Sequence, residues 1–329
     1  MRLCWERSFI PSPPKSQPSG NYLLALVGPT ASGKTAIACE IAKRLPVEMI
    51  SCDSMQVYKS MPILTQAPTT AEKKKLKMHL VSFLNPSEDY NAAFFRRDAL
   101  KAIEKIQKKR RLPLLVGGTG LYLRALMDGL FEAEGDEGRD DRLREKLESE
   151  QKTYGGNWLH DQLSKADPAS AVKIHPHDIR RIVRALEVYH GTGKPISEHK
   201  PKREGIRYLF SCRIFLLNRE RPELYSRIER RVDQMVKKGL LAEVRRLSRM
   251  KPGLTASMAL GYRQMKMVCE KKILLEEATT LLKRDTRHYA KRQLSWFRHE
   301  KNIEMMPVKL GEAPAVIARK IVTLWEAGQ

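Results

Sequence analysis

The feature that most constrains the fold is a glycine-rich segment between an apolar run and an amphipathic stretch. It reads Gly28-Pro-Thr-Ala-Ser-Gly-Lys34-Thr35 and matches the pattern GxxxxGK[ST], after a predicted strand (22–28) and before a predicted helix (34–45). At such a junction the glycines let backbone N–H groups turn toward an anion, and the helix start adds the positive end of its dipole. The lysine supplies a charge, and the threonine hydroxyl can hold Mg²⁺. The segment therefore predicts a loop that binds a polyphosphate, without specifying ATP.

The residues of this loop form the predicted anion site. The expected contacts are Gly28, Pro29, Thr30, Ala31, Ser32, Gly33, Lys34 and Thr35. Thr35 is also the expected metal ligand, with Mg²⁺ as the expected ion.

Short apolar runs alternate with amphipathic stretches along the first part of the chain. One predicted helix places Phe95, Ala99, Ile103 and Ile106 on one face. Continuous apolar strands separated by helices indicate a parallel sheet covered on both faces, which is an α/β fold. After residue 218 the sequence is nearly all helical in character. The predicted strands are 22–28, 47–52, 78–84, 112–118 and 208–218.

The long gap between the fourth and fifth predicted strands is charged and helical in character, so we expect a helical subdomain inserted into the α/β core. The first twenty residues are rich in Pro and Ser and lack the apolar stretch of a secretory signal, so they are expected to form a disordered tail. The predicted parts are a tail over 1–20, a core over 21–125 and 206–310, an insertion over 126–205, and a C-terminal helix or tail over 311–329.

Basic residues outnumber acidic ones, with 61 Lys and Arg against 38 Asp and Glu and a net charge of +23. An enzyme of small metabolites does not need this balance, whereas RNA, DNA or an anionic membrane surface would explain it. No run is long and apolar enough to cross a bilayer. The five cysteines are scattered without a CxxC pair, which argues against a zinc finger and favours a reducing cytoplasm. Nothing indicates a protein partner, and a monomer is favoured.

Two polar residues directly follow predicted strands. Asp53 lies in SCDSMQVY after the second strand, and Thr119 lies in the glycine-rich turn GGTG after the fourth. Ligands of open parallel sheets bind beyond the carboxyl ends of the strands, so both residues are expected beside the anion loop. A carboxylate there could ligate Mg²⁺ or act as a general base, while the alternative is a turn or N-cap aspartate. For Thr119 the alternative is a plain tight turn.

A basic helix is predicted over 177–195, with an N-cap at Asp178 and an end at Gly191. Arg180 and Arg184 share one face of it, and like charges at that spacing repel. An anionic partner would relieve the repulsion, although a solvated face is the alternative interpretation. The apolar stripe of this helix consists of Ile179, Ile182, Val183 and Leu186.

Two later helices repeat this pattern. The first, 223–235, carries Arg227 and Arg231, and the second, 283–298, mixes basic and aromatic residues, as a nucleic-acid surface does. Its aromatic residues Trp296 and Phe297 are more simply explained as core. The residues of the first helix that are expected to face inward are Leu224, Ile228, Val232 and Met235.

Eight segments in one order carry a resemblance: GPTASGKT, DSMQVY, FRRDALKAI, PLLVGGTGLYLRAL, RIVRALEVY, RIERRVDQM, GYRQ and AKRQLSWFR. The series resembles the bacterial tRNA dimethylallyltransferases, also called tRNA isopentenyltransferases, over about residues 22–300. The resemblance implies a P-loop nucleotide-kinase-like α/β core whose helical insertion grips the anticodon stem–loop of tRNA. It also implies that the loop holds the diphosphate of dimethylallyl diphosphate with Mg²⁺, and that the acceptor is the exocyclic amine of adenosine 37, beside the anticodon, in tRNAs that read codons beginning with U.

The resemblance also implies roles for individual residues. Asp53 is the implied base, Thr119 hydrogen-bonds near the reacting groups, and either Arg227 or Arg231 contacts the diphosphate. Residues 53–56 would read an adenosine that has left its stack. The implied tRNA contacts are Asp53, Ser54, Met55, Gln56, Thr119, Arg144, Arg180, Arg181, Ile182, Val183, Arg184, Gly261, Tyr262, Arg263 and Gln264.

The chain also departs from the pattern. Where relatives typically read M-D-I-G-T-A-K-P, it has Met61-Pro-Ile-Leu-Thr-Gln-Ala-Pro68, so that a glycine and a lysine are replaced. Two other functions stay open on the residues alone. A P-loop small-molecule or nucleotide kinase would explain the loop and Asp53 but not the basic helices. A non-catalytic RNA-binding module would explain the charge but not the set of Lys34, Asp53 and Thr119.

Overall fold

The computed structural model describes residues 21–130, 140–199 and 205–328, so the predicted tail over 1–20 lies outside the described residues. The chain divides into two compact units. We call residues up to Met127 and from Ile206 onward the core unit, and residues from Asp128 to Gly205 the insertion unit. The predicted insertion began two residues earlier, at 126.

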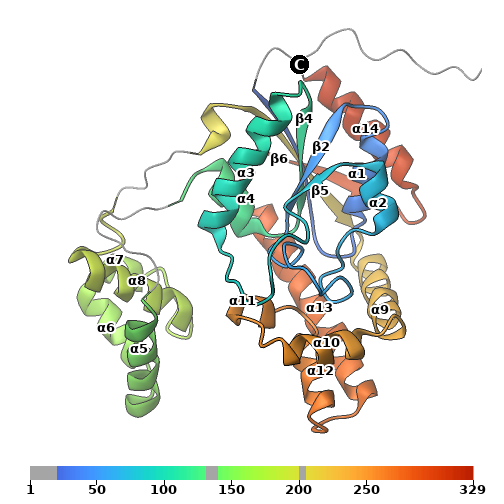
Figure 1. The fold of residues 1–329 in the computed structure, drawn as a ribbon. Helices are drawn as coiled ribbons and strands as arrows, with labels where there is room; N and C mark the ends of the chain where they lie inside the picture. The colour runs from blue at the N-terminus through green and yellow to red at the C-terminus, as the bar shows by residue number, and fades with distance from the viewer. Residues whose placement is uncertain (1–20, 131–139, 200–204, 329) are drawn as a thin grey trace, which may run out of the picture. The chain divides into compact units, whose positions relative to one another are not determined.

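The core unit is built on a six-stranded parallel sheet in the order β3-β2-β4-β1-β5-β6 (Figure 1). The strands are β1 (Tyr22–Val27), β2 (Val47–Cys52), β3 (Met78–His79), β4 (Leu112–Gly117), β5 (Ser211–Arg219) and β6 (Ile303–Val308). Cys52 and Val27 both pair with Gly117, and Val27 pairs with Leu216 on its other side. The predicted α/β class is therefore confirmed.

Three strand predictions need correction. The strand predicted over 78–84 stops at His79, because Leu80 and Ser82 adopt positive φ and leave the extended conformation. The last predicted strand begins at Ser211, because Ile206–Tyr208 form a 3₁₀ turn. β6 was not predicted, since this edge strand buries only two side chains and contains a proline, which edge strands tolerate.

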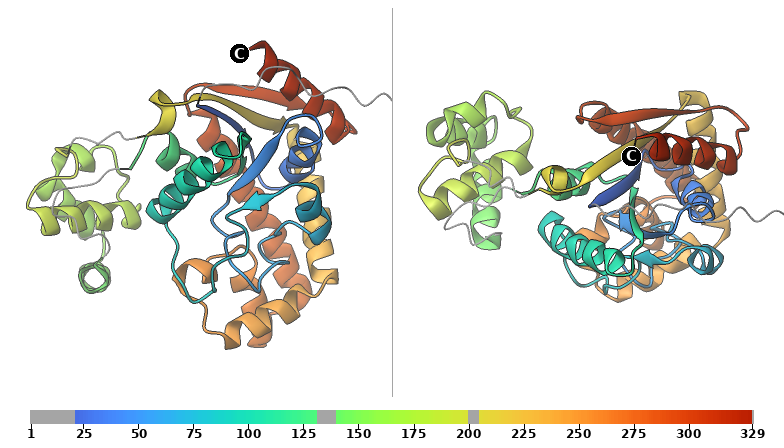
Figure 2. Two further views of the ribbon diagram at one scale, coloured as in Figure 1. Left: turned by 45° about the horizontal axis from the view of Figure 1, so that its top comes forward. Right: turned by 90° about the horizontal axis from the view of Figure 1, so that it is seen from above.

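Helices cover both faces of the sheet (Figures 1 and 2). One face packs on α1 (Lys34–Ile41) and α14 (Pro314–Ala327), and the other on α3 (Ala92–Gln107) and α4 (Gly120–Met127). Because alternate strand residues point to opposite faces, Leu24 belongs to one apolar cluster and Ala25 to the other. The residues predicted on one face of α3 are all buried: Phe95, Ala99, Ile103 and Ile106.

The rest of the core unit is helical. Its elements are α2 (Thr70–Lys75), α9 (Arg221–Lys237), α10 (Leu240–Arg249), α11 (Leu254–Ser257), α12 (Tyr262–Cys269) and α13 (Leu275–Arg298). The stripe predicted to face inward on α9 is buried, and so is Phe297 of α13, while Trp296 is half-buried. Within the described residues, no helix combines the length and the apolar composition that a bilayer span requires.

The insertion unit is a small helical bundle with its own apolar core. It contains α5 (Asp141–Tyr154), α6 (Trp158–Ala166), α7 (Pro168–Ala171) and α8 (Ile179–Thr192). The Asp178 carboxylate accepts a hydrogen bond from the Arg181 N–H, as expected of the N-cap. The helix ends at Thr192 rather than at Gly191, because Gly193 takes the left-handed conformation, with φ 70°, that closes it.

Candidate active site at the carboxyl edge of the sheet

The order of the strands brings the predicted catalytic residues together. β2, β4, β1 and β5 are consecutive neighbours, so the segments that follow them lie in one row at the carboxyl edge. That row contains Asp53, Thr119, the loop 28–35 and Arg219. Gly117 makes the row narrow, because a Cβ at this position would collide with the backbone of Cys52. A carboxylate and an anion loop therefore face the same small region.

The anion loop has the backbone of a phosphate cradle. Gly33 has φ 97° at the start of α1, a conformation in which side chains are strained, and Ala31 is also held at positive φ. The Ser32 hydroxyl is fully buried and has no hydrogen-bond partner among the residues that the structure describes. Buried polar groups rarely lack partners. An orphaned hydroxyl inside a glycine-rich loop therefore indicates a group that a ligand completes.

Lys34 folds back over the loop. Its Nζ donates hydrogen bonds to the carbonyl oxygens of Gly28 at 2.9 Å and Pro29 at 2.8 Å. Burial lowers the pKa of Lys34 from 10.5 to about 8, and the carboxylate of Asp53 opposes this shift while Arg231 adds to it. The two hydrogen bonds thus hold the ammonium in place although burial disfavours its charge, and a bound anion would offset that unfavourable free energy.

Two arginines contact the same loop through their Nε atoms, and a third reaches it through Nη1. Arg219 donates to the carbonyl of Ser32 at 2.9 Å and also pairs with Glu223. Arg227 donates to the carbonyl of Ala31 at 2.8 Å. The bond from Arg227 uses a backbone acceptor, so it holds that guanidinium without neutralising it, whereas the Glu223 carboxylate lies 2.5 Å from Arg219 Nη1. The structure thus adds Arg219 to the predicted set.

Arg231 reaches the loop from the next turn of α9. Its Nε donates to Gln66 Oε1 at 2.7 Å, and its Nη1 lies 3.5 Å from Thr30 Oγ1. Burial lowers the pKa of Arg231, and it lowers that of Arg227 as well. Both arginines that the sequence left as alternatives therefore border the loop, and each is a candidate for contact with an anion.

Asp53 begins a tight turn. Its Oδ1 accepts hydrogen bonds from the backbone N–H groups of Met55 at 2.9 Å and Gln56 at 3.3 Å. Within the described part of the chain, both bonds end on Oδ1, which leaves Oδ2 for a proton. Thr119 Oγ1 accepts from the Ser54 N–H at 3.1 Å, so the turn after β4 is tied to the turn after β2. Asp53 therefore shapes the turn, as the alternative interpretation held, and this role is compatible with a reactive one.

Gln293 is a site residue that sequence reasoning missed. This buried side chain of α13 accepts from the Thr30 N–H at 2.9 Å and donates to the carbonyl of Gly118 at 2.8 Å. It therefore fastens the anion loop to the turn after β4. The signal that could have found it is its place in a buried stripe with Ala290 and Phe297, where an apolar residue would be expected.

Two of the predicted RNA contacts in the insertion unit have buried side chains. Ile182 and Val183 are buried at 0% and 3% exposure and pack in the core of the bundle, as their place in the apolar stripe requires. Arg180 and Arg181 of the same helix are exposed. All four remain predictions as RNA contacts.

The other two arginines predicted to contact RNA, Arg144 and Arg184, share one buried carboxylate. Arg144 grips Glu187 with two bonds of 2.7 and 2.8 Å, and Arg184 adds a third of 2.8 Å. Burial alone would raise the pKa of Glu187, but the hydrogen bonds from Arg144 and Arg184 outweigh it and lower that pKa to about 2. Both guanidinium groups are therefore fixed before any RNA arrives, and both remain predicted contacts.

The segment Gly261–Gln264 presents one residue to solvent. Tyr262 is buried, and Gln264 donates to Asp285 at 2.7 Å, whereas Arg263 is exposed. Arg263 lines a surface cavity of about 390 Å³ together with Lys266 and Lys272. Arg263 is therefore the member of this segment best placed for an RNA phosphate.

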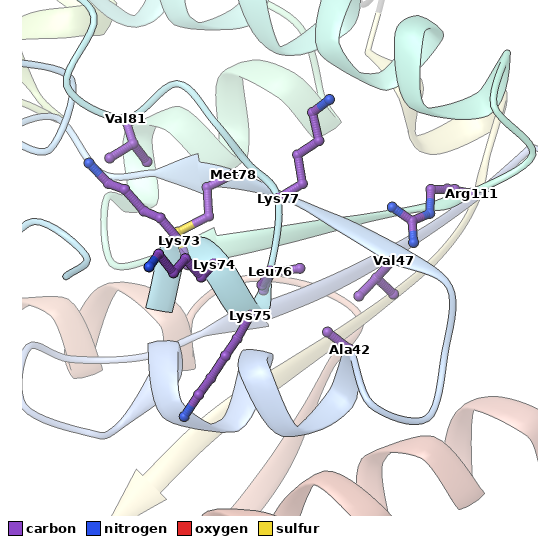
Figure 3. A pocket seen from close by; sticks show the side chains of 10 residues that line it. All are labelled: Ala42, Val47, Lys73, Lys74, Lys75, Leu76, Lys77, Met78, Val81 and Arg111. Carbon is purple, nitrogen blue, oxygen red and sulfur yellow. The ribbon is translucent and has the colours of Figure 1, made fainter. Parts of the chain in front are cut away.

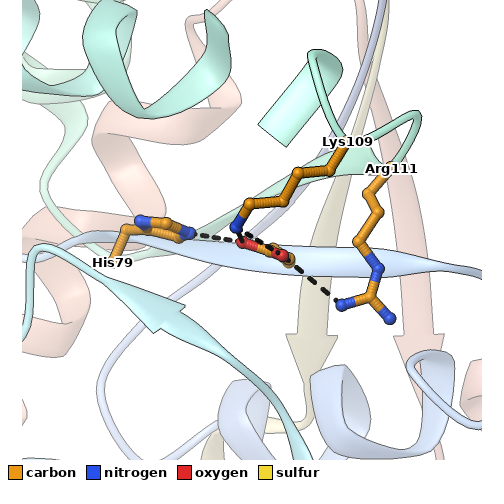
Figure 4. A network of polar contacts seen from close by, with 4 residues as sticks. His79, Lys109 and Arg111 are labelled. Atoms are coloured by element: carbon orange, nitrogen blue, oxygen red, sulfur yellow. Dashed lines mark hydrogen bonds and ion pairs between the residues drawn. The ribbon is translucent and has the colours of Figure 1, made fainter. Parts of the chain in front are cut away.

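A basic cavity of about 590 Å³ lies at the opposite, amino edge of the sheet, where β2 begins. Figure 3 shows lysines of α2 around it whose side chains point in different directions rather than toward one point. Near the start of β2, Glu48 is buried and bound by His79, Lys109 and Arg111, which Figure 4 labels. The cavity is lined by Ala42, Val47, Lys73, Lys74, Lys75, Leu76, Lys77, Met78, Val81 and Arg111.

Comparisons with known proteins agree with this geometry. The chain matches the IPP transferase family over residues 56–300 and the isopentenyl transferase family over 21–83. It is 43% identical over 307 residues to a tRNA dimethylallyltransferase of Carboxydothermus hydrogenoformans, covering 93% of this chain and 97% of the relative.

Solved structures are similar as well. A tRNA isopentenylpyrophosphate transferase of Bacillus halodurans superimposes with a TM-score of 0.67 at 39% identity, covering 93% of this chain and 97% of that one. A eukaryotic dimethylallyltransferase acting on tRNA gives a TM-score of 0.73 at 27% identity, over 88% of this chain and 74% of that one. The chain therefore belongs to the IPP transferase family and is, like these relatives, a tRNA prenyl-transferring enzyme.

Proposed function

We propose that the enzyme transfers a dimethylallyl group from dimethylallyl diphosphate to the exocyclic amine of adenosine 37 in tRNAs that read codons beginning with U. The products are isopentenyladenosine and diphosphate. The observation that carries the proposal is the row of side chains at the carboxyl edge, where the carboxylate of Asp53 acts electrostatically on Lys34 beside a cradle with an orphaned hydroxyl.

The anion loop would hold the leaving group. Breaking the allylic C–O bond places positive charge on carbon and negative charge on the diphosphate oxygens, so the barrier falls where fixed positive groups meet those oxygens. Lys34, Arg227 and Arg231 are such groups, and their protein hydrogen bonds go to carbonyl or amide oxygens rather than to carboxylates. An allylic diphosphate is already activated, so the reaction needs no ATP.

Asp53 would accept the proton of the attacking amine. The amine is a weak nucleophile because its lone pair is delocalised into the purine, and it gains from a base that takes its proton as the N–C bond forms. Asp53 Oδ2 is the available acceptor, since Oδ1 is occupied by the turn. The adenosine must leave its stack to reach this position, and residues 54–56 would contact it.

The residues present suit Mg²⁺. The hydroxyl of Thr35 in the first turn of α1 is a hard oxygen ligand, and Mg²⁺ at phosphate sites takes few protein ligands and several phosphate oxygens. Among the described residues no group of three or more His, Cys, Asp or Glu side chains could hold a metal ion. When bound, the ion would neutralise diphosphate charge beside Lys34.

The partner would be tRNA in the cytoplasm. A net charge of +23 and the exposed arginines of α8 suit the phosphate backbone of an anticodon stem–loop. A small-molecule kinase has no use for these arginines, and a non-catalytic RNA-binding module has no use for Lys34 and Asp53 at one edge of the sheet.

The test is incubation of the purified full-length enzyme with total tRNA and dimethylallyl diphosphate, followed by mass spectrometry of the nucleosides. We expect isopentenyladenosine to appear, and to be absent without the donor. A parallel reaction with ATP alone should release no phosphate above background. Turnover of ATP together with unmodified tRNA would instead establish a kinase.

A further inference from the structure

We propose that Gln66 is a positioning residue that orients the Arg231 guanidinium toward the anion loop while leaving its charge intact. Gln66 lies on the loop 61–68, outside the anion cradle and outside the segment expected to read the base. The inference rests on the proposed function, because it assigns Arg231 to the diphosphate.

Both the oxygen and the nitrogen of the Gln66 side-chain amide make hydrogen bonds. Its Oε1 accepts from Arg231 Nε at 2.7 Å, and its Nε2 donates to the carbonyl of Ile63 at 2.6 Å. The second bond fixes the orientation of the amide, so the oxygen rather than the NH₂ group faces the arginine. The backbone carbonyl of Gln66 also accepts from Gln56 Nε2 at 3.3 Å. Gln66 is therefore held on three sides.

The loop that carries Gln66 is anchored from α10. The carboxylate of Glu243, which is buried at 4% exposure, accepts from the N–H groups of Ile63 at 3.0 Å and Leu64 at 2.7 Å. The loop is therefore a fixed support, even though Gln66 itself has φ 52°.

The choice of Nε matters for anion binding. A guanidinium presents donors in a planar fork, and a partner on Nε leaves the two terminal nitrogens for a second acceptor. One of them, Nη1, lies 3.5 Å from Thr30 Oγ1 in the anion loop, so this side of the fork faces the expected diphosphate. An amide oxygen carries no net charge, so it directs the fork without neutralising the arginine as a carboxylate would.

The experiment measures binding of inorganic diphosphate with Mg²⁺ by calorimetry, using the full-length enzyme. Gln66→Met keeps an unbranched side chain of similar size at the same φ but removes both amide bonds. We expect it to weaken diphosphate binding about tenfold, as loss of a hydrogen bond to a charged group does. The KM for the prenyl donor should rise in proportion, while the KM for tRNA should change less than twofold. Gln234→Met, at an exposed position of α9, the helix that carries Arg231, is the matched control and should bind as the wild type.

Two further variants separate positioning from a structural role. Arg231→Met should also weaken binding, and adding Gln66→Met to it should weaken binding by less than about twofold more, because Gln66 acts through Arg231. Gln66→Glu keeps the acceptor but adds a negative charge, so we expect it to weaken diphosphate binding despite a retained hydrogen bond. This variant also decides the question if Gln66→Met does not fold.

Wild-type affinity in Gln66→Met, multiplied penalties in the double variant, or unchanged binding by Gln66→Glu would each overturn the inference. The proposed function can fail separately. If wild-type enzyme binds diphosphate with the expected pattern among the variants but forms no isopentenyladenosine, the positioning role stands and the prenyl-transfer assignment falls.

Discussion

The two edges of the central sheet treat buried charge in opposite ways. At the amino edge a buried anion, Glu48, is surrounded by His79 at 2.7 Å, Lys109 at 3.2 Å and Arg111 at 3.4 Å. At the carboxyl edge the half-buried cations Lys34 and Arg231 are bonded to carbonyl, amide or hydroxyl oxygens. The first arrangement is complete within the protein, whereas the second is completed by an anion from outside.

The difference is visible in the pKa values. Burial opposes ionisation of Glu48, but its hydrogen bonds outweigh burial and lower its pKa to about 2, so the charged form is favoured. Burial dominates at Lys34 and lowers its pKa to about 8, so the charged form is disfavoured. A group paired inside the fold stabilises it, and a group left for a ligand costs stability until the ligand binds.

The largest expected effect is at the carboxyl edge. Asp53→Asn keeps an oxygen for the turn but removes the proton acceptor, so the single-turnover rate of prenyl transfer should fall roughly 10²- to 10⁴-fold. Affinity for tRNA, measured by filter binding, should stay within a few-fold of wild type. An unchanged rate, or a variant that does not fold, would reject the assignment of Asp53 as the base.

Lys34→Met should weaken diphosphate binding without lowering the stability of the fold. It removes a direct charge on the anion, so diphosphate affinity should fall about 100-fold, as loss of a charge-assisted contact in a buried site does. The free energy of unfolding at pH 7 should not decrease, because the folded state no longer carries a buried ammonium. Calorimetry and urea denaturation measure the two effects, and a less stable variant would contradict the comparison.

The pH dependence of the wild type has a defined sign at Lys34. Its pKa is lowered by folding, so between pH 8 and 10.5 the unfolded chain binds more protons and this residue makes stability rise with pH. Diphosphate binding should weaken above pH 8 as the ammonium loses its proton. Lys34→Met should lack both trends.

Glu48→Gln breaks the arrangement at the amino edge. We expect a loss of about 2–3 kcal/mol of unfolding free energy at pH 7, with diphosphate affinity unchanged. The pKa of Glu48 is lowered, so its contribution is present above pH 4.5 and is lost as pH falls toward about 2. Variant and wild type should therefore converge in acid. Glu104→Gln, at an exposed pair with Lys108, is the control and should change stability by less than about 1 kcal/mol.

The smallest effect concerns the insertion unit. Arg180→Ala combined with Arg181→Ala should lower the slope of log affinity for tRNA against log salt by about 1–2, because each phosphate contact releases about one counterion. Arg184 is excluded, since its bond to Glu187 would confound the result. Lys165→Ala with Lys173→Ala, also exposed, is the matched control. An unchanged slope would remove α8 from the interface.

The local pattern of apolar and polar residues predicts much of the fold. The strands predicted from continuous apolar runs appear with small shifts, because their residues are buried on both faces of the sheet. β6 escaped prediction because an edge strand needs few buried side chains. The buried stripe of α8 was predicted, and it contains Ile182 and Val183, whose contact with RNA stays a prediction.

The candidate site was predictable only where one segment carries the signal. The anion loop and Asp53 follow strands and could be placed from the parallel topology. Gln293 and Gln66 act on the loop from helix α13 and from the loop 61–68, with sequence separations of 263 and 165 from their partners Thr30 and Arg231. Contacts of that range depend on tertiary packing, which residue spacing does not encode.

Gly117 helps to set the distance between Asp53, the proposed base, and the loop proposed to hold the leaving group. Since any side-chain atom there would strike the backbone of Cys52, no change of rotamer could relieve the clash. Alanine would have to push β2 and β4 apart, and Asp53 would move away with β2. The position of the Asp53 carboxylate relative to the anion loop is therefore set by an absent methyl group, at a position that contributes no chemistry of its own.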